Sequence, residues 1–159
     1  MRKSADLDDF DLAILDILQR DNTVPQRTIG EQINLSAPAV QRRIKRMQAD
    51  GVIQANIAVV DPVAVALPIT IIVEVQIADE RYDLINAIKR SFLDAPEVQQ
   101  CYQVTGEADF VLIVMVASMS DYQALCRRLF HDNPNVTKFK SLVSMDRVKI
   151  GLSLPLMQD

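Results

Sequence analysis

The pattern of hydrophobic and polar residues divides the chain in two. Over about the first fifty residues, hydrophobic side chains recur every three or four positions, which is the period of an amphipathic helix. Three such stretches follow one another with short joints, so the pattern predicts a compact three-helix unit. The side chains expected to pack together are Phe10, Ile14, Leu15 and Leu18, then Ile29 and Ile33, then Val40, Ile44 and Met47.

The residues between these stretches are suited to begin and end helices. Asp8 or Asp9 can cap the first helix, and Pro25 can open the second, where its missing N–H costs nothing. Asn34 tolerates the left-handed conformation that ends a helix, and Ser36 is a natural N-cap for the third helix. The sequence therefore predicts a helix-turn-helix.

After Gly51 the hydrophobic residues alternate at strand spacing. Residues 52–60 are β-prone and end at Asp61-Pro62, which indicates a hinge between domains, with an extended strand as one form. The elements expected after the hinge are strands at 67–77, 98–105, 109–117 and 136–150, with helices at 79–93 and from Ser120 to Phe130. This β-α-β-β-α-β order is typical of the ferredoxin-like fold, with both helices on one face of an antiparallel sheet. The other face is also apolar, so we expect a second subunit to cover it.

Charge is distributed unevenly over the 159 residues. The net charge is −4, yet residues 36–50 carry Arg42, Arg43, Lys45 and Arg46 against Asp50, a local charge of +3. Exposed charges act over a Debye length of about 8 Å, so the local charge governs contact with phosphate. A helix with one apolar and one basic face is the arrangement of a DNA recognition helix. A merely solvated charged face is the alternative, and the three-helix context favours binding of double-stranded DNA.

Other classes of function find little support in the sequence. Cys101 and Cys126 lie 25 positions apart without a CxxC motif, and they are expected to be free thiols. His131 is the only histidine and lies beside a helix-ending Asp-Asn-Pro. We find no phosphate loop, metal-ligand spacing or nucleophile with a neighbouring base, so we expect no catalytic residue, metal or cofactor.

The sequence also suggests where the protein works. No apolar run reaches the roughly 20 residues of a membrane helix, and the charged amino terminus lacks a leader. A cytoplasmic, nucleoid-associated protein without a membrane partner is expected. A DNA-organising nucleoid protein and a ferredoxin-like dimeric enzyme remain alternatives to a regulator.

Three motifs occur along the chain in a fixed order. They are Leu7-Asp8-x-x-Asp11-x-x-Ile14-Leu15-x-x-Leu18-Gln19-x-Asp21, then Leu35-Ser36-x-x-x-Val40-x-x-Arg43-Ile44-x-Arg46-Met47, then Val104-Thr105-Gly106-Glu107-Ala108-Asp109-Phe110 followed by Met119-Ser120-Asp121-Tyr122. With these motifs, essentially the whole chain resembles the Lrp/AsnC (feast/famine) family of transcription regulators. The resemblance implies an α+β protein with a winged-type helix-turn-helix at 1–52, a linker strand at 53–66 and a ferredoxin-like (RAM) domain at 67–159.

The resemblance also implies partners and sites. Family members form homodimers that assemble to tetramers or octamers, bind pseudo-palindromic operators and respond to small effectors, mostly amino acids. Arg42, Lys45 and Arg46 are expected to bind phosphate rather than bases. Gln41 either reads adenine or is simply solvated, and Arg43 either braces the fold or contacts DNA. The candidate DNA-binding residues are Ser36, Ala37, Pro38, Gln41, Arg42, Lys45 and Arg46.

The expected effector site surrounds the loop of the hairpin. Gly106 would let a carboxylate approach the backbone N–H groups, and Asp109 or Glu107 would pair with an ammonium group. A plain hairpin turn is the alternative interpretation of the same residues. Two departures from the family pattern are Ala108, often aromatic in relatives, and Gly30, where alanine is common and glycine costs about 1 kcal/mol. The candidates are Thr105, Gly106, Glu107, Ala108, Asp109, Met119, Leu142, Val143 and Ser144.

Overall fold

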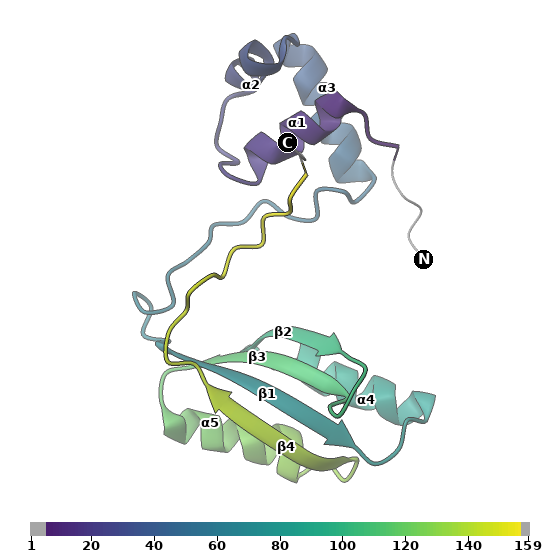
Figure 1. The fold of residues 1–159 in the computed structure, drawn as a ribbon, viewed down its shortest axis with the longest axis vertical. Coiled ribbons are helices and arrows are strands. Elements are labelled where there is room, and N and C mark those ends of the chain that lie inside the picture. Colours follow the sequence, from purple (N-terminus) through teal and green to yellow (C-terminus); the bar gives the residue numbers. More distant parts are fainter. Residues whose placement is uncertain (1–5, 157–159) are drawn as a thin grey trace. The chain divides into compact units, whose positions relative to one another are not determined.

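The computed structural model describes residues 6–156, which form two compact units (Figure 1). The first unit contains the described residues up to Ala58 together with those from Lys149 onward, and the second contains Val59–Val148. This division differs from the expected one at the carboxyl end, because residues 149–156 group with the amino-terminal helices rather than with the ferredoxin-like sheet.

Three helices build the first unit. They are α1 (Asp9–Leu18), α2 (Gln26–Ile33) and α3 (Ala37–Ala49). Ile14, Ile29, Val40 and Met47 are fully buried where the helices meet, as the helical spacing predicts. Phe10 was predicted to join this core and does not: it is 42% exposed, because its ring lies beside the guanidinium of an arginine on α3.

A return of the chain explains why the carboxyl-terminal segment belongs to the first unit. The Gln19 side-chain amide follows α1, donates from Nε2 to the Leu154 carbonyl at 2.8 Å, and accepts the Leu154 N–H on Oε1 at 2.8 Å. The Gln19 side chain thus pairs with both backbone groups of Leu154, as a neighbouring strand would. Such a pairing gives no signal in the local sequence.

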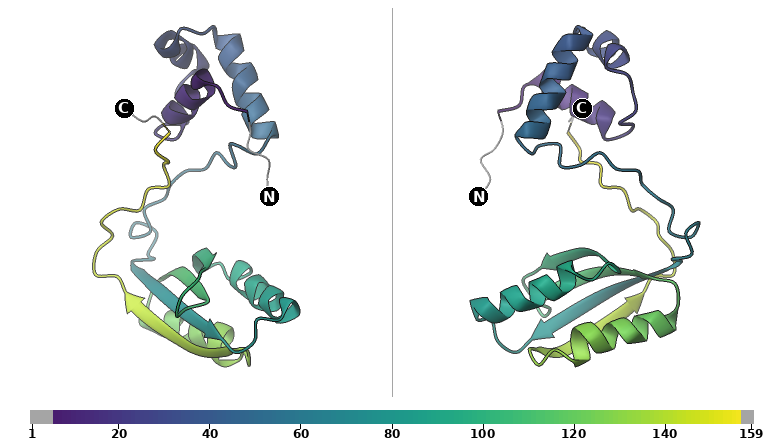
Figure 2. Two further views of the ribbon diagram at one scale, coloured as in Figure 1. Left: turned by 45° about the vertical axis from the view of Figure 1, so that its right-hand side comes forward. Right: turned by 180° about the vertical axis from the view of Figure 1, so that it is seen from behind.

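The second unit is a four-stranded antiparallel sheet with helices on one face. Its elements are β1 (Ile69–Ile77), α4 (Tyr82–Leu93), β2 (Val98–Gln103), β3 (Phe110–Val116), α5 (Met119–Cys126), the π-helical turn η1 (Arg127–His131) and β4 (Val136–Val143). The strand order is β2-β3-β1-β4, and Figure 2 shows α4 and α5 on the same side. The ferredoxin-like arrangement is confirmed.

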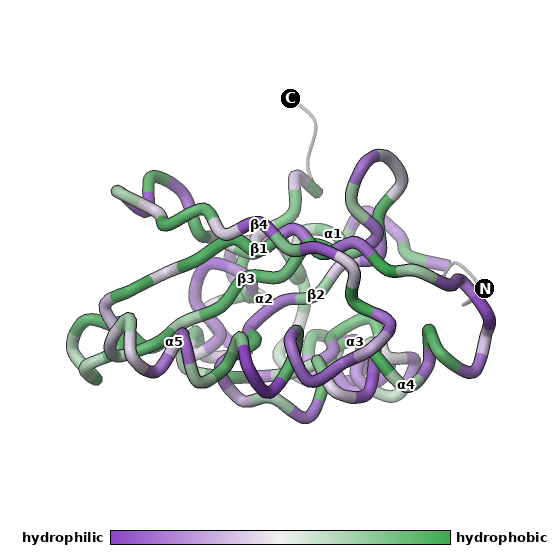
Figure 3. Tube along the Cα trace, turned by 90° about the horizontal axis from the view of Figure 1, so that it is seen from below, coloured by the Kyte–Doolittle hydropathy of each residue, from purple (hydrophilic) through white to green (hydrophobic). Residues whose placement is uncertain are grey.

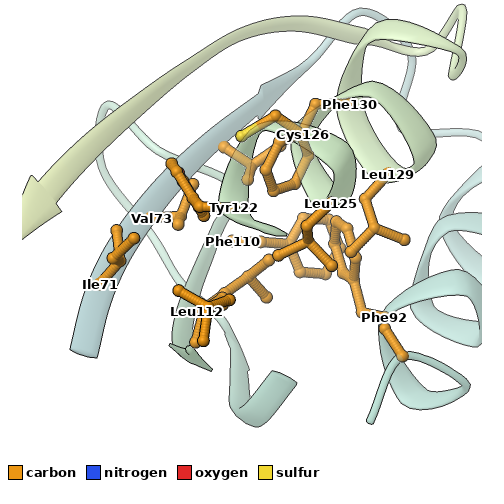
Figure 4. Close-up of a cluster of buried hydrophobic side chains, with 14 of the residues drawn as sticks. Ile71, Val73, Phe92, Phe110, Leu112, Tyr122, Leu125, Cys126, Leu129 and Phe130 are labelled. Atoms are coloured by element: carbon orange, nitrogen blue, oxygen red, sulfur yellow. The ribbon is translucent and has the colours of Figure 1, made fainter. Parts of the chain in front are cut away.

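Alternation along the strands places the core of this unit. Ile71, Val73 and Val75 of β1 are fully buried, and β3 buries every second residue from Phe110 to Val116. Figure 4 shows Ile71, Val73, Phe110 and Leu112 of the sheet with Leu125, Cys126, Leu129 and Phe130 of α5 and η1 and Phe92 of α4. The Phe92 ring lies edge-on to that of Phe110, with 5.6 Å between the ring centroids. β3 is hydrophobic throughout in Figure 3. None of the helices within residues 6–156 is long and apolar enough to cross a membrane.

Some expected elements differ in detail. Residues 53–66 contain no strand, so the linker strand that the resemblance implied is not formed within the described residues. A strand needs a partner for its backbone groups, and the described residues provide none there. The second helix of the sheet domain is capped by Ser118 and not by Ser120: the Ser118 hydroxyl accepts the Asp121 N–H at 3.1 Å. The last strand ends at Val143 rather than at residue 150.

Candidate functional site

A tight turn sets the position of α3. Asn34 adopts the left-handed conformation (φ 58°, ψ 43°), and the Leu35 N–H donates to the Gly30 carbonyl at 2.9 Å. The Ser36 hydroxyl then accepts the Ala39 N–H at 3.3 Å and caps α3. Both the left-handed end of α2 and the serine cap are confirmed. Asn34 and Ser36 together begin α3 directly after the turn.

The backbone of the turn passes so close to α2 that only glycine fits. A Cβ built on the buried Gly30 would lie 2.3 Å from the Leu35 carbonyl oxygen. Glycine at this position therefore has a structural reason, because it lets the turn lie directly on the helix. The cost of glycine inside a helix is offset by that close approach.

One face of α3 is buried and the other is exposed. Val40 and Met47 have no exposed surface, whereas Ser36, Pro38, Gln41, Arg42 and Lys45 are exposed and Ala37 is half-buried. In the part of the chain that the structure describes, neither Arg42 nor Lys45 takes part in an ion pair. Both cations are thus available to an external anion.

The other two cations of α3 bind carboxylates of α1. Arg43 Nη1 donates to both oxygens of Asp8, at 2.9 and 2.8 Å, and to Asp11 Oδ1 at 2.8 Å. Arg46 Nη2 donates to Asp11 Oδ2. Asp11 is fully buried, so its charge needs these partners. Arg43 also lies over the Phe10 ring, 5.5 Å from the centroid.

The same carboxylates hold the start of α1. Asp8 and Asp11 form a reciprocal capping box, in which each side chain accepts the backbone N–H of the other residue, at 2.9 and 3.2 Å. The Asp11 N–H and then the guanidinium of Arg43 lower the pKa of Asp8 below its ordinary value. In return, Asp11 first and Asp8 second raise the pKa of Arg43. Arg43 is a brace between α1 and α3.

Comparison with known proteins shows what these two units are. The AsnC-type helix-turn-helix domain matches residues 7–48, and the Lrp/AsnC ligand binding domain matches residues 70–154. The chain belongs to the Lrp/AsnC family. This Lrp/AsnC protein is therefore a DNA-binding transcriptional regulator and not an enzyme.

Similar proteins align with the Lrp/AsnC chain over nearly its full length. A helix-turn-helix-type transcriptional regulator of Sinorhizobium fredii is 40% identical over 95% of this chain and 89% of its own. The glutamate uptake regulatory protein of Zymomonas mobilis is 36% identical over 94% of this chain and 91% of its own. The crystal structure of an AsnC family regulator from Agrobacterium tumefaciens has a TM-score of 0.88 and 30% identity, covering 94% of this chain and 97% of that one.

A second solved structure contains a small molecule. It is a transcriptional regulator of Neisseria meningitidis in complex with L-Met, with a TM-score of 0.87 and 26% identity, covering 94% of this chain and 97% of that chain. That regulator is thus seen with an amino acid bound, on a fold that superposes on nearly all of the present one.

The predicted effector residues fall into two groups in this Lrp/AsnC structure. One group is the β2–β3 loop, where Thr105, Gly106 and Glu107 are exposed and Ala108 and Asp109 are half-buried. Gly106 has φ +126°, and a Cβ there would meet nothing within 4 Å, so the loop surface is open. The second group comprises Met119 at the start of α5 and Leu142, Val143 and Ser144 at the end of β4, of which the first three are exposed.

Asp109 already has a structural partner. Its Oδ2 accepts the Ile77 N–H at 2.7 Å, which fixes the end of β1. Its backbone N–H donates to the Val75 carbonyl at 2.9 Å, and the Glu107 carbonyl accepts from the Gln76 side chain at 2.7 Å. The Glu107 carboxylate remains exposed. Of the two acids predicted to pair with an ammonium group, Glu107 has the carboxylate without a hydrogen bond in the described structure.

The buried ion pairs of Asp11 were not predicted from the sequence. A signal was available, because Asp11 lies three residues before Ile14 and so falls on the hydrophobic face of α1. A carboxylate on a buried face requires a cationic partner, and the facing helix carries four candidates. The part of the chain that the structure describes contains no cluster of His, Cys, Asp or Glu that could hold a metal ion.

Proposed function

We propose that this regulator binds a pseudo-palindromic operator through α3 and that an amino acid changes its DNA affinity or its assembly. The observation that carries the DNA interface is the pair of exposed cations Arg42 and Lys45, which have no ion-pair partner among residues 6–156, on a helix capped by Ser36. Ala37 and Pro38 lie in the first turn of that helix, where residues of a recognition helix approach base edges. Gln41 completes the proposed interface, whereas Arg46, also predicted from the sequence to bind phosphate, is held by Asp11 of α1.

The proposed assembly follows from the face of the sheet that the helices leave uncovered. Ile72 lies between Ile113 on β3 and Leu142 on β4 in the register of the sheet, on the side opposite the buried Ile71 and Val73. A row of apolar residues on an open sheet face favours a homodimer, which can assemble further to a tetramer or octamer. A two-fold dimer would present two α3 helices to two half-sites of one operator. A regulator that binds chromosomal DNA would act in the cytoplasm, at the nucleoid.

Names of relatives support an amino acid as the effector. They include a glutamate uptake regulatory protein, a leucine-responsive regulatory protein and the regulator solved with L-Met. In the present chain, we propose that the open Gly106 loop binds the effector carboxylate through backbone N–H groups and that Glu107 pairs with its ammonium group. Thr105, Ala108, Asp109 and Ser144 would border the effector, and Met119, Leu142 and Val143 would form an apolar wall.

The effector is tested by thermal shift against the twenty amino acids, since a ligand that binds the folded state raises its apparent stability. An amino acid that raises the melting temperature should also change operator affinity in fluorescence anisotropy, with the operator obtained by selection from random duplexes. Glu107→Gln should weaken both responses and leave DNA affinity without effector unchanged. Asp94→Asn is the matched control, because Asp94 is an exposed acid at the other end of β2. Equal responses in the wild type and Glu107→Gln would refute the proposed contact.

A further inference from the structure

Two of the four cations of α3, Arg43 and Arg46, are paired with carboxylates of the same unit. Arg43 is 19% exposed at its side chain and is held by Asp8, Asp11 and the Phe10 ring. Arg46 is 47% exposed and is held by Asp11, whose side chain is 1% exposed. The carboxylate oxygens of Asp8 and Asp11 occupy the N–H groups of these arginines as phosphate oxygens would.

We propose that Asp8 and Asp11 are specificity-determining residues, which hold Arg43 and Arg46 back from DNA phosphates and so keep non-specific affinity low. Non-specific binding depends almost entirely on the number of phosphates that the protein neutralises. In a non-specific complex the register on DNA is not fixed, so each arginine that a carboxylate holds is one phosphate contact fewer. At the operator the base contacts fix which phosphates lie within reach, so operator affinity is lowered less and the ratio of specific to non-specific affinity rises.

Once released from the carboxylates, Arg43 and Arg46 would lie beside a third arginine of α3, Arg42. Arg42, Arg43 and Arg46 line a hollow of about 170 Å³ on α3. Arg42 contributes to it without any carboxylate partner in the described structure, whereas Arg43 and Arg46 turn their guanidinium N–H groups to α1. Removing the carboxylates would therefore add cations beside one that is already free.

The size of the effect follows from counterion release. Each added phosphate contact steepens the slope of log K against log salt by about 0.9 and strengthens binding roughly eightfold at 0.1 M salt. Releasing both arginines is expected to steepen the slope on random duplex DNA by about 1 to 2 per subunit. Operator affinity should rise less, because the bound register already fixes which phosphates lie within reach.

The test measures anisotropy of the full chain on random and selected duplexes over a salt series, for the wild type and the Asp8→Asn/Asp11→Asn variant. Asparagine is isosteric with aspartate, and it caps helices as well as aspartate does. We expect a steeper slope, tighter binding to random DNA and a smaller specificity ratio. An unchanged or shallower slope would overturn the proposal. Asp16→Asn is the matched control, because it removes one charge from α1 whose partner is Arg20 and not α3.

Further variants keep the result decisive if the double variant folds poorly, as judged by circular dichroism. Arg43→Met in the wild-type background should leave the slope on random DNA unchanged, since its charge is already neutralised by carboxylates. Arg42→Met should reduce the slope by about 0.9 per subunit. A reduced slope in Arg43→Met would overturn the inference.

The inference rests on the proposed DNA interface, and the same measurements separate the two. If Arg42→Met and Lys45→Met both leave the slope unchanged, α3 is not the interface and both proposals fail. If they reduce the slope while Asp8→Asn/Asp11→Asn does not steepen it, the interface stands and only the role of the carboxylates is refuted.

Discussion

Replacing Gly30 with alanine tests whether the turn before α3 depends on the close approach of its backbone. The new Cβ would lie 2.3 Å from the Leu35 carbonyl oxygen, whereas ordinary contact begins at 3.4 Å. Moving the oxygen outward by the missing distance of about 1 Å would strain the hydrogen bond from the Leu35 N–H to the Gly30 carbonyl, which measures 2.9 Å. The obstacle is backbone, so no side chain can simply rotate away.

Opposing effects determine the free energy of unfolding of Gly30→Ala. Alanine favours the helix by about 1 kcal/mol relative to glycine. Overpacking costs about 1–3 kcal/mol, and weakening the turn hydrogen bond costs about 0.5–1.5 kcal/mol. We expect a net loss of roughly 1–3 kcal/mol. For a domain of about 60–100 residues, each kcal/mol lowers the melting temperature by about 4–8 °C.

Thermal unfolding followed by circular dichroism at 222 nm measures this loss. Gly151→Ala is the control, because a Cβ there would meet only the Ser153 hydroxyl, at 3.7 Å, and the backbone does not require glycine. The control should unfold at the wild-type temperature. A Gly30→Ala variant that is as stable as the wild type or more stable would show that the turn shifts freely and does not require glycine at this position.

Three further predictions concern capping, acid and the thiols. Ser36→Ala should lower the free energy of unfolding by about 1 kcal/mol, whereas Ser36→Asp should leave it unchanged because aspartate caps helices equally well. Equal stability of the two variants in thermal unfolding would exclude a capping role. The pKa of Asp8 is lowered in the folded protein, so its carboxylate contributes stability that is present above pH 3.8, its pKa in the unfolded chain, and is lost as the pH falls through the folded pKa. The melting temperature should therefore fall less between pH 5 and pH 2 in Asp8→Asn than in the wild type. Burial raises the pKa of Cys101 and of Cys126, so iodoacetamide at pH 7.5 should alkylate both more slowly in the folded protein than in urea, and equal rates would contradict the burial.

Local features of the sequence predicted the fold well. The left-handed Asn34 and the Ser36 cap depend only on neighbouring residues, and the alternation of β1 is visible in four or five consecutive positions. The cap of α5 shows the limit of such evidence. Ser118 and Ser120 are each followed three residues later by a side chain able to complete a capping box, so the pattern alone does not choose between them.

Contacts between distant residues were not predictable in the same way. The hydrogen bonds between Gln19 and Leu154 join residues 135 positions apart, and nothing in the alternation of the last residues indicates where they go. Residues 53–66 illustrate the opposite case: β propensity indicated a hinge with an extended strand as one form, and the described residues provide no partner for such a strand. A segment with high strand propensity forms a strand only where another strand pairs with its backbone N–H and C=O groups.

The candidate DNA interface combines both kinds of information. Helical spacing identified Arg42 and Lys45 as exposed, and they are. Arg46 was expected to bind phosphate with them, but its partner is Asp11 on another helix. Counting charges along one helix therefore overstates the charge that is available to DNA. The first fifty residues carry no net charge, partly because of the acids in α1 and at its N-cap, and two of these acids, Asp8 and Asp11, lie against the basic helix. If α3 is the DNA interface, as proposed, its free cations should be a better measure of the phosphate contacts than either its total charge or the net charge of the chain.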